Sequence, residues 1–365
     1  MKKNFLSLCA LLTALLLIGG CAQKPAEPQY QKYQMQFFGA FDTVIQLVGY
    51  TTTEQEFTEY ADYTQKRFVE LSHTFDRFYE YEGINNIRTV NLKAGIAPVK
   101  VDPIVLDVID LCRQWYTETD GQINIAMGSV LSVWHDYMEL YADDPQGAKL
   151  PSTEELNSAA KHMNMDDIIT DREAGTVYLA EKGMVLDTGA VAKGYCAQVV
   201  ADELYALGFT SFIISAGGNV VTADPPLDGI RKSWGIGIQD PFADVNDPNS
   251  PSTEVMFVTG ESVVTSGDYQ RFYMVGDKRI HHIIDPDTLM PADYYRGLTI
   301  VHEDSGMADL FSTSLFCMDY PTSRAFAEKH GLKVLWILPD GSVEYTDNLL
   351  PQLRDRGGAT AAIDK

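Results

Sequence analysis

Residues 183–219 contain the pattern that most constrains the fold of this chain. An apolar run at residues 184–186 ends in Asp187, and apolar residues then recur with helical spacing over residues 190–207. A glycine follows that pattern directly, which is a common helix stop, and a second apolar run begins at residues 212–214. We therefore expect a strand, a helix and a strand in succession.

The start of this predicted helix has the composition of a phosphate-binding turn. Gly189, Ala190 and Gly194 leave backbone N–H groups accessible, and Lys193 adds a mobile cation. Unpaired N–H groups and the helix dipole attract phosphate at a helix start. The pattern is neither the dinucleotide fingerprint nor a Walker loop, and glycine-rich turns often serve only to redirect the chain. Taken alone, the segment therefore leaves a purely structural turn open.

A second cluster lies near the C-terminus. Asp309 and Thr313 are four residues apart in a predicted helix that follows a strand, so they share one helical face near its positive end. A carboxylate and a hydroxyl are hard oxygen ligands suited to Mg²⁺ when carbonyl or phosphate oxygens complete the shell. The alternative is a helix-start charge beside a small core residue.

A third cluster combines small polar residues with histidine. Thr-Ser-Gly at residues 265–267 ends one predicted strand, and His281 and His282 precede a short apolar run that ends in Asp285. Successive strand residues point to opposite faces, so only one histidine can face a given pocket. That histidine could exchange a proton near neutral pH, with Asp285 orienting it or contacting a ligand.

The N-terminal sequence predicts export. Two lysines precede an apolar run at residues 8–18, which is too short to span a bilayer stably. The sequence Leu-Ile-Gly-Gly-Cys that ends at Cys21 resembles a bacterial lipoprotein cleavage site, and an ordinary secretory signal is the alternative. We expect a signal peptide at residues 1–20, lipidation of Cys21 and a tether at residues 21–34. The mature chain would then be extracytoplasmic, held to the cell membrane by acyl chains.

The chain is strongly acidic, with a formal net charge of −23 at pH 7. Cleavage after residue 20 would remove two lysines and no acidic residue. This charge argues against nucleic acid or an anionic bilayer surface as a partner, and a phosphorylated ligand would need local compensation such as a divalent cation. Cys112, Cys196 and Cys317 have apolar neighbours and are odd in number, so we expect buried thiols rather than disulfides or a zinc site.

Helical and strand patterns are mixed without strict alternation, which indicates an α+β domain with a largely antiparallel sheet. Strand patterns occur at residues 43–48, 176–180, 233–239, 255–259, 272–275, 297–302 and 333–338, and helical patterns at residues 53–75, 103–118, 153–163, 190–207, 307–318 and 321–330. With no internal repeat or long linker, we expect one domain over residues 35–350 and a tail at residues 351–365.

Taken in order, these segments resemble the ApbE family of FAD:protein FMN transferases. The matching segments are residues 37–43 (FFGAFDT), 121–128 (GQINIAMG), 187–194 (DTGAVAKG), 216–219 (AGGN), 265–267 (TSG), 282–286 (HIIDP) and 308–313 (ADLFST). Each segment is a weak signal alone, but all of them in this order span nearly the whole mature chain. The resemblance implies an ApbE-like, T-fold-related single domain with flanking helices and an FAD cleft between subdomains.

The resemblance also implies a set of site residues. The Mg²⁺ ligands would be Asp309, Thr313 and the backbone carbonyl of Ala190, with Gly306 nearby. Contacts with FAD would come from Phe41, Phe78, Ala126, Met127, Gly128, Asp187, Lys193, Thr265, Ser266, Gly267 and His281. Members of the family often carry Met where this chain has Phe41, and Ala190 also departs from the family pattern. Because Ala190 would act through its carbonyl, that departure leaves the metal site intact.

The implied reaction is transfer of FMN from FAD to a Thr or Ser hydroxyl of an acceptor flavoprotein, with release of AMP. His282 would be the general base, and Mg²⁺ would neutralise charge on the phosphates. Acceptors would be flavoprotein subunits of Rnf- or Nqr-type complexes or similar extracytoplasmic flavoproteins. Two alternatives stay open: an Mg²⁺-dependent FAD pyrophosphatase that gives FMN and AMP, and a solute-binding lipoprotein.

Overall fold

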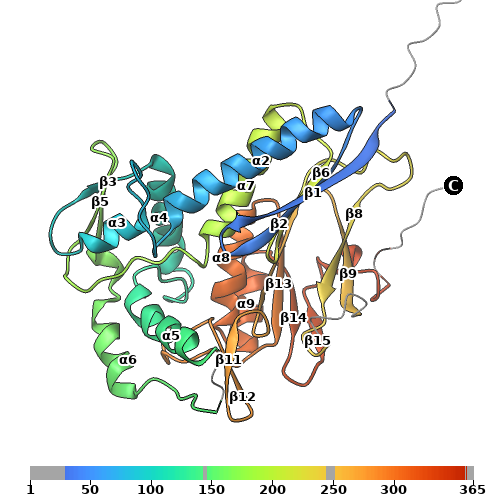
Figure 1. Ribbon diagram of the computed structural model, residues 1–365. Coiled ribbons are helices and arrows are strands. Elements are labelled where there is room, and N and C mark those ends of the chain that lie inside the picture. Colours follow the sequence, from blue (N-terminus) through green and yellow to red (C-terminus); the bar gives the residue numbers. More distant parts are fainter. Residues whose placement is uncertain (1–28, 143–145, 244–250, 358, 360–365) are drawn as a thin grey trace, which may run out of the picture.

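The computed structural model describes residues 29–142, 146–243, 251–357 and 359, so the predicted signal peptide and Cys21 lie outside the described residues. An eight-stranded sheet in which every neighbouring pair is antiparallel forms the centre of the fold (Figure 1). In spatial order its strands are β1 (Gln31–Ala40), β2 (Thr43–Thr51), β6 (Phe212–Ala216), β7 (Asn219–Thr222), β10 (Ser262–Gly267), β13 (Gly297–His302), β14 (Lys333–Ile337) and β15 (Val343–Tyr345). This arrangement confirms the predicted α+β class with a largely antiparallel sheet.

Each face of the sheet has its own apolar core. One face packs against the helices α2 (Glu54–Phe75), α7 (Ala192–Ala206), α8 (Ser305–Phe316) and α9 (Tyr320–Lys329) (Figure 1). The hairpin of β8 (Trp234–Gln239) and β9 (Ser252–Val258) covers part of the other face. Along β14, Trp336 belongs to the helical core while Leu335 and Ile337 belong to the hairpin core. Successive side chains of a strand point to opposite faces of the sheet. Because both faces of these strands are covered by apolar cores, nearly every residue along them is apolar.

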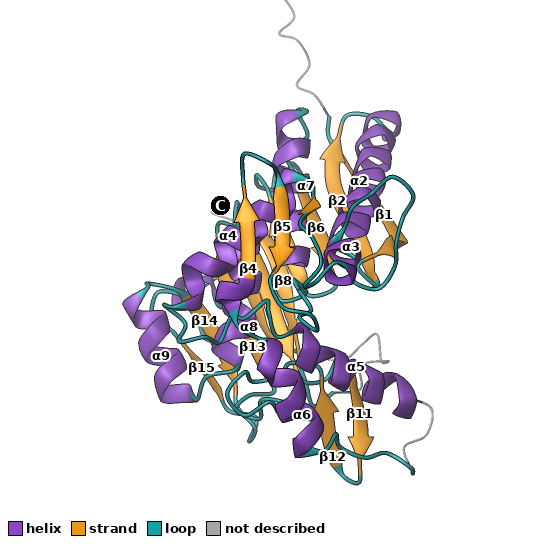
Figure 2. Cartoon of the chain, turned by 90° about the vertical axis from the view of Figure 1, so that its left-hand side faces the viewer, coloured by secondary structure: helices purple, strands orange, loops and turns teal. Residues whose placement is uncertain are grey.

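The remaining elements form two smaller groups (Figure 2). The first holds α3 (Ile87–Leu92), α4 (Pro103–Tyr116) and a three-stranded sheet of β3 (Val99–Lys100), β5 (Thr176–Leu179) and β4 (Ile168–Asp171). The second, which we call the small lobe, holds α5 (Gly128–Tyr141), α6 (Thr153–Ala159) and the hairpin of β11 (Phe272–Val275) and β12 (Lys278–His281). The small lobe has a separate core that includes Trp134, Tyr273 and Ile280. Short 3₁₀ turns lie at Ala160–His162, Met165–Asp167 and Leu350–Gln352.

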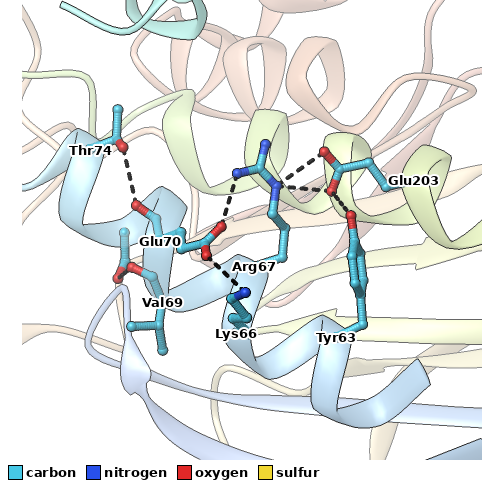
Figure 3. A network of polar contacts seen from close by, with 8 residues as sticks. Tyr63, Lys66, Arg67, Val69, Glu70, Thr74 and Glu203 are labelled. Atoms are coloured by element: carbon cyan, nitrogen blue, oxygen red, sulfur yellow. Dashed lines mark hydrogen bonds and ion pairs between the residues drawn. The ribbon is translucent and has the colours of Figure 1, made fainter. Parts of the chain in front are cut away.

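A polar network joins α2 to α7 (Figure 3). Arg67 Nε donates to both carboxylate oxygens of Glu203, at 3.1 and 3.0 Å, and the Tyr63 hydroxyl donates to the same carboxylate at 3.0 Å. Glu70 extends the network through Arg67 Nη1 at 3.3 Å and Lys66 Nζ at 3.8 Å. The Arg67 and Glu203 side chains are each 30% exposed, so this pair contributes at most about 1 kcal/mol. The network links the two helices through exposed and partly exposed side chains.

The central strand–helix–strand expectation holds only in part. Met184 and Leu186 are buried as a strand would require, but only Val185 pairs, in an isolated parallel bridge with Met127. The segment is therefore an extended connection rather than a strand. The helix begins at Ala192 instead of residue 190, and β6 follows it as expected.

The ordered chain extends past both expected domain boundaries. Strand β1 begins at Gln31, so part of the segment that we expected to be a tether belongs to the central sheet. At the other end, Leu353 is fully buried and pairs with Met256 of β9. Among the described residues, no helix combines the length and apolar composition needed to cross a membrane.

Candidate functional site

The first turn of α7 packs closely against α8. The Gly194 backbone N–H donates to Asp309 Oδ2 at 2.7 Å, and Asp309 is only 4% exposed. A Cβ at position 194 would lie 2.3 Å from the Ser305 carbonyl oxygen and 2.5 Å from Asp309 Cβ. Glycine is therefore required here by close approach, and the glycine turn and the late helix lie together.

Two oxygens near this contact have no hydrogen-bond partner among the described residues. Gly194 is the third residue of α7, where an N–H group has no partner within the helix, and Asp309 satisfies it instead. No hydrogen bond from the described residues reaches the Ala190 carbonyl or the Thr313 hydroxyl. A carboxylate, a carbonyl and a hydroxyl are the oxygen types that Mg²⁺ binds, so these residues fit the ion.

Burial and nearby groups act on Asp309 in opposite directions. Burial raises the pKa of the Asp309 carboxyl, and the Lys193 ammonium, the Gly194 N–H and the Asn219 amide oppose that increase. Asn219 is 1% exposed, and its Nδ2 lies beside the carboxylate without making a hydrogen bond of normal geometry. Lys193 forms no ion pair with a described residue, so its charge is available to an anionic ligand. The described residues contain no group of three or more His, Cys, Asp or Glu side chains that could hold a metal.

His282 lies directly after β12, and its side chain is exposed. Its Nδ1 lies 3.3 Å from the Arg271 carbonyl oxygen, which also accepts the His282 backbone N–H at 3.2 Å. A carbonyl can only accept, so Nδ1 carries the proton and Nε2 has the free lone pair.

The surroundings keep the His282 ring neutral. Loss of water from around the ring is the largest cause of a pKa well below the usual histidine value, and Arg271, His281 and Lys193 lower it further. The side chain is nevertheless accessible to solvent. The Lys193 charge contributes to the pKa of both His282 and Asp309, so both residues lie within its electrostatic range.

Two expectations about the neighbours of His282 are not supported. His281 is 4% exposed; its Nε2 donates to the Ala292 carbonyl at 2.7 Å, and its Nδ1 accepts the Ile283 N–H at 3.3 Å. With both ring nitrogens used inside the protein, His281 offers nothing to FAD. Asp285 is also buried and caps a turn by accepting the Asp287 N–H at 2.8 Å, with no described contact to His282. The Arg271 carbonyl takes the orienting role that we expected of Asp285.

Asp187, which precedes the Gly189–Gly194 turn, is held by a residue that sequence reasoning missed. Arg77 Nη1 lies 2.9 Å from Asp187 Oδ2, while Asp187 Oδ1 accepts the Gly189 N–H at 2.8 Å. The Arg77 guanidinium also lies over the Phe78 ring, 4.6 Å from its centroid. No local pattern links Arg77 to Asp187, so the sequence offered no signal beyond its place beside Phe78.

Residues 126–128 lie against the same segment. Ala126 and Met127 are buried, and Gly128 begins α5, a helix that the sequence analysis did not predict. A Cβ at Gly128 would lie 2.3 Å from the Val185 carbonyl oxygen. The α5 N-terminus therefore adjoins the connection that leads to Asp187.

Two turns lie close together at one end of the central sheet. Phe41 and Asp42 form the two-residue turn between β1 and β2 with φ of 53° and 50°, as a type I′ hairpin requires. Gly217 follows β6, and a Cβ there would lie 2.2 Å from Thr43 Oγ1, which glycine avoids. Gly218 approaches the Thr265 carbonyl oxygen. Phe41 is partly buried, whereas Phe78 is 42% exposed.

The other predicted residues lie in the supporting structure. Thr265 Oγ1 bonds Thr299 Oγ1 at 2.9 Å, and Ser266 Oγ bonds Ser312 Oγ at 2.8 Å, which joins the end of β10 to β13 and α8. Gly267 is buried at the end of β10. Gly306 packs against Tyr195 of α7, where its lack of a side chain permits close helix packing.

A buried carboxylate, a lysine with no ion pair to a described residue and a histidine of lowered pKa are groups suited to group transfer at phosphorus. The chain belongs to the ApbE family, whose model matches residues 41–336. A FAD:protein FMN transferase of Klebsiella pneumoniae is 30% identical over 67% of this chain and 74% of its own length. A FAD:protein FMN transferase of Treponema pallidum is 30% identical over 73% of this chain and 75% of its own length.

Solved structures share the fold. The ApbE protein of Thermotoga maritima superposes with a TM-score of 0.74 at 26% identity, covering 87% of this chain and 98% of that one. The flavin transferase ApbE of Vibrio cholerae superposes with a TM-score of 0.73 at 19% identity, covering 89% of this chain and 100% of that one. The fold predicted from the sequence is therefore confirmed.

Proposed function

We propose that this protein transfers FMN from FAD to a Ser or Thr hydroxyl of an acceptor protein and depends on Mg²⁺. The contact between Gly194 and Asp309 at 2.7 Å carries the proposal, because it joins the glycine turn to a buried carboxylate. Relatives named FAD:protein FMN transferase support the reaction. Asp309, Thr313 and the Ala190 carbonyl would hold the ion, which when bound would neutralise charge on the substrate phosphates.

The residues of this chain supply the remaining chemistry. His282 Nε2 accepts the proton of the acceptor hydroxyl, whose oxygen forms a bond to the FMN phosphorus. The bond from that phosphorus to the bridging oxygen of the diphosphate breaks, and AMP leaves with its electron pair. Lys193 compensates negative charge during the exchange because no described acidic side chain is paired with it.

We also propose that the enzyme acts outside the cytoplasm while anchored through lipidated Cys21. The apolar run and the Leu-Ile-Gly-Gly-Cys sequence support this location. Flavoprotein subunits of Rnf- or Nqr-type complexes are the acceptors that we propose, since anchoring would hold enzyme and acceptor at one membrane surface. In the producing cell, Cys21→Ser should release the protein from the membrane fraction; retention there would contradict the anchor.

A labelling assay tests the reaction. Purified enzyme is incubated with FAD, Mg²⁺ and such an acceptor subunit, and flavin fluorescence on the acceptor is read after denaturing electrophoresis while AMP is measured by chromatography. We expect a fluorescent acceptor and an equal amount of AMP, and neither product after chelation of the metal. FMN and AMP without a labelled acceptor would instead indicate a pyrophosphatase, and no cleavage of FAD would contradict both.

A further inference from the structure

We propose that Arg77 is a positioning residue for the nucleotide substrate, acting through Asp187. This inference rests on the proposed function, because it concerns how that same site holds FAD. Arg77 follows the end of α2 and lies between three segments that the sequence analysis assigned to FAD binding, at Phe78, Gly128 and Asp187.

The contacts of Arg77 are directed at all three segments. Its Nη1 lies 2.9 Å from Asp187 Oδ2 and 3.4 Å from the Gly128 carbonyl oxygen, and its guanidinium lies over the Phe78 ring. The second oxygen of Asp187 accepts the Gly189 N–H at 2.8 Å, at the start of the turn that leads to Lys193. One side chain thus links the end of α2, the start of α5 and the glycine turn.

The electrostatics of this position also require a cation. Asp187 begins the turn that would receive a diphosphate, and an unpaired carboxylate there would repel the substrate. The Arg77 and Asp187 side chains are 11% and 13% exposed, so water screens this pair less than it screens a surface pair. Arg77 therefore both orients Asp187 and offsets its charge before FAD arrives.

The chain offers a matched control in the same region. Arg67, ten residues earlier, pairs with Glu203 at 3.0 Å, but both side chains are 30% exposed and the pair lies on the α2–α7 surface (Figure 3). Arg67→Gln removes the same chemical group without touching the Asp187 segment. It should change thermal stability alone.

The test measures FAD affinity directly, by quenching of flavin fluorescence without Mg²⁺ or acceptor, for wild type, Arg77→Gln, Arg77→Lys, Asp187→Asn and the double variant Arg77→Gln/Asp187→Asn. For Arg77→Gln we expect the FAD dissociation constant to increase about 10- to 100-fold, which corresponds to the loss of one charged hydrogen bond. Arg77→Lys keeps the charge but loses the planar guanidinium group. Its FAD dissociation constant should therefore lie between those of wild type and Arg77→Gln. The FAD dissociation constant of Arg67→Gln should stay within about twofold of the wild-type value, because distant sites act independently.

The double variant separates action through Asp187 from a general structural effect. If Arg77 acts through Asp187, the double variant should bind FAD no more weakly than Arg77→Gln, and KM for FAD should rise while kcat at saturation stays close to wild type. Unchanged FAD affinity in a folded Arg77→Gln protein, or two effects that multiply in the double variant, would overturn the inference while leaving the proposed function standing. A wild-type protein that does not bind FAD would overturn both.

Discussion

Gly194→Ala tests the contact on which the site depends. The added methyl would lie 2.3 Å from the Ser305 carbonyl oxygen, 2.5 Å from Asp309 Cβ and 2.9 Å from Asn219 Nδ2. None of these atoms is the end of a flexible exposed side chain, so α7 and α8 must separate by about 1 Å to restore ordinary contact distances. That separation would stretch the hydrogen bond from residue 194 to Asp309.

The expected magnitudes follow from opposing effects. Alanine gains about 1 kcal/mol over glycine in a helix, whereas overpacking a core costs typically 1–3 kcal/mol. With three close contacts the steric cost lies at the upper end, so we expect a net loss of about 2 kcal/mol and a melting temperature lower by about 4 °C. A displacement of about 1 Å in a catalytic site costs roughly 100-fold in rate, so transfer should suffer more than stability.

Thermal unfolding and the flavin-labelling assay measure the two effects separately. Gly235→Ala in β8 is the matched control, because its nearest neighbour would be Phe257 Cε1 at an ordinary 3.4 Å. The control should melt and react like wild type. If Gly194→Ala also keeps wild-type melting and transfer, α7 and α8 do not meet as described and the reasoning about the metal site is wrong.

Three further predictions concern the site and its surroundings. His282→Ala should slow transfer by about 10²- to 10⁴-fold while FAD affinity stays near wild type, and an unchanged rate would remove His282 as the base. Asp309→Ala should abolish Mg²⁺-dependent labelling and weaken Mn²⁺ binding measured by calorimetry, with circular dichroism as the check on folding; normal Mn²⁺ binding would exclude Asp309 as a ligand. The buried His281 has a pKa below 6.5 in the folded protein, so the unfolded chain binds more protons just below that pH. In denaturant titrations, the free energy of unfolding should therefore stay constant above pH 6.5 and decrease as the pH falls below 6.5. If the free energy of unfolding of His281→Gln depends on pH as steeply as that of wild type, His281 is not the cause.

Sequence patterns predicted much of the fold because they depend on local periodicity. The helical spacing after Asp187 predicted α7 to within two residues, and apolar runs predicted β2, β6, β13 and β14 of the central sheet. They failed where periodicity was interrupted. Residues 184–186 read as a strand but make only one bridge, and α5 was missed although it begins at a glycine of a recognised motif.

The chemical roles of polar residues were predicted less completely. The sequence identified both His281 and His282 as candidates but could not say which one faces a pocket. Packing of the small lobe buries His281 and leaves His282 accessible. The structure shows the Arg271 carbonyl beside His282 in place of the expected partner Asp285. The sequence could not predict this contact, because every residue has a backbone carbonyl.

By itself, the sequence determined the α+β class, the glycine turn with its neighbouring cation, and the carboxylate and hydroxyl on one face of the late helix. Only the tertiary structure decided that Gly194 donates to Asp309, 115 residues away, and that Arg77 pairs with Asp187. The reason is physical: periodicity reports which face of one element is apolar. The pairing of polar groups depends on which elements the folded sheet brings together.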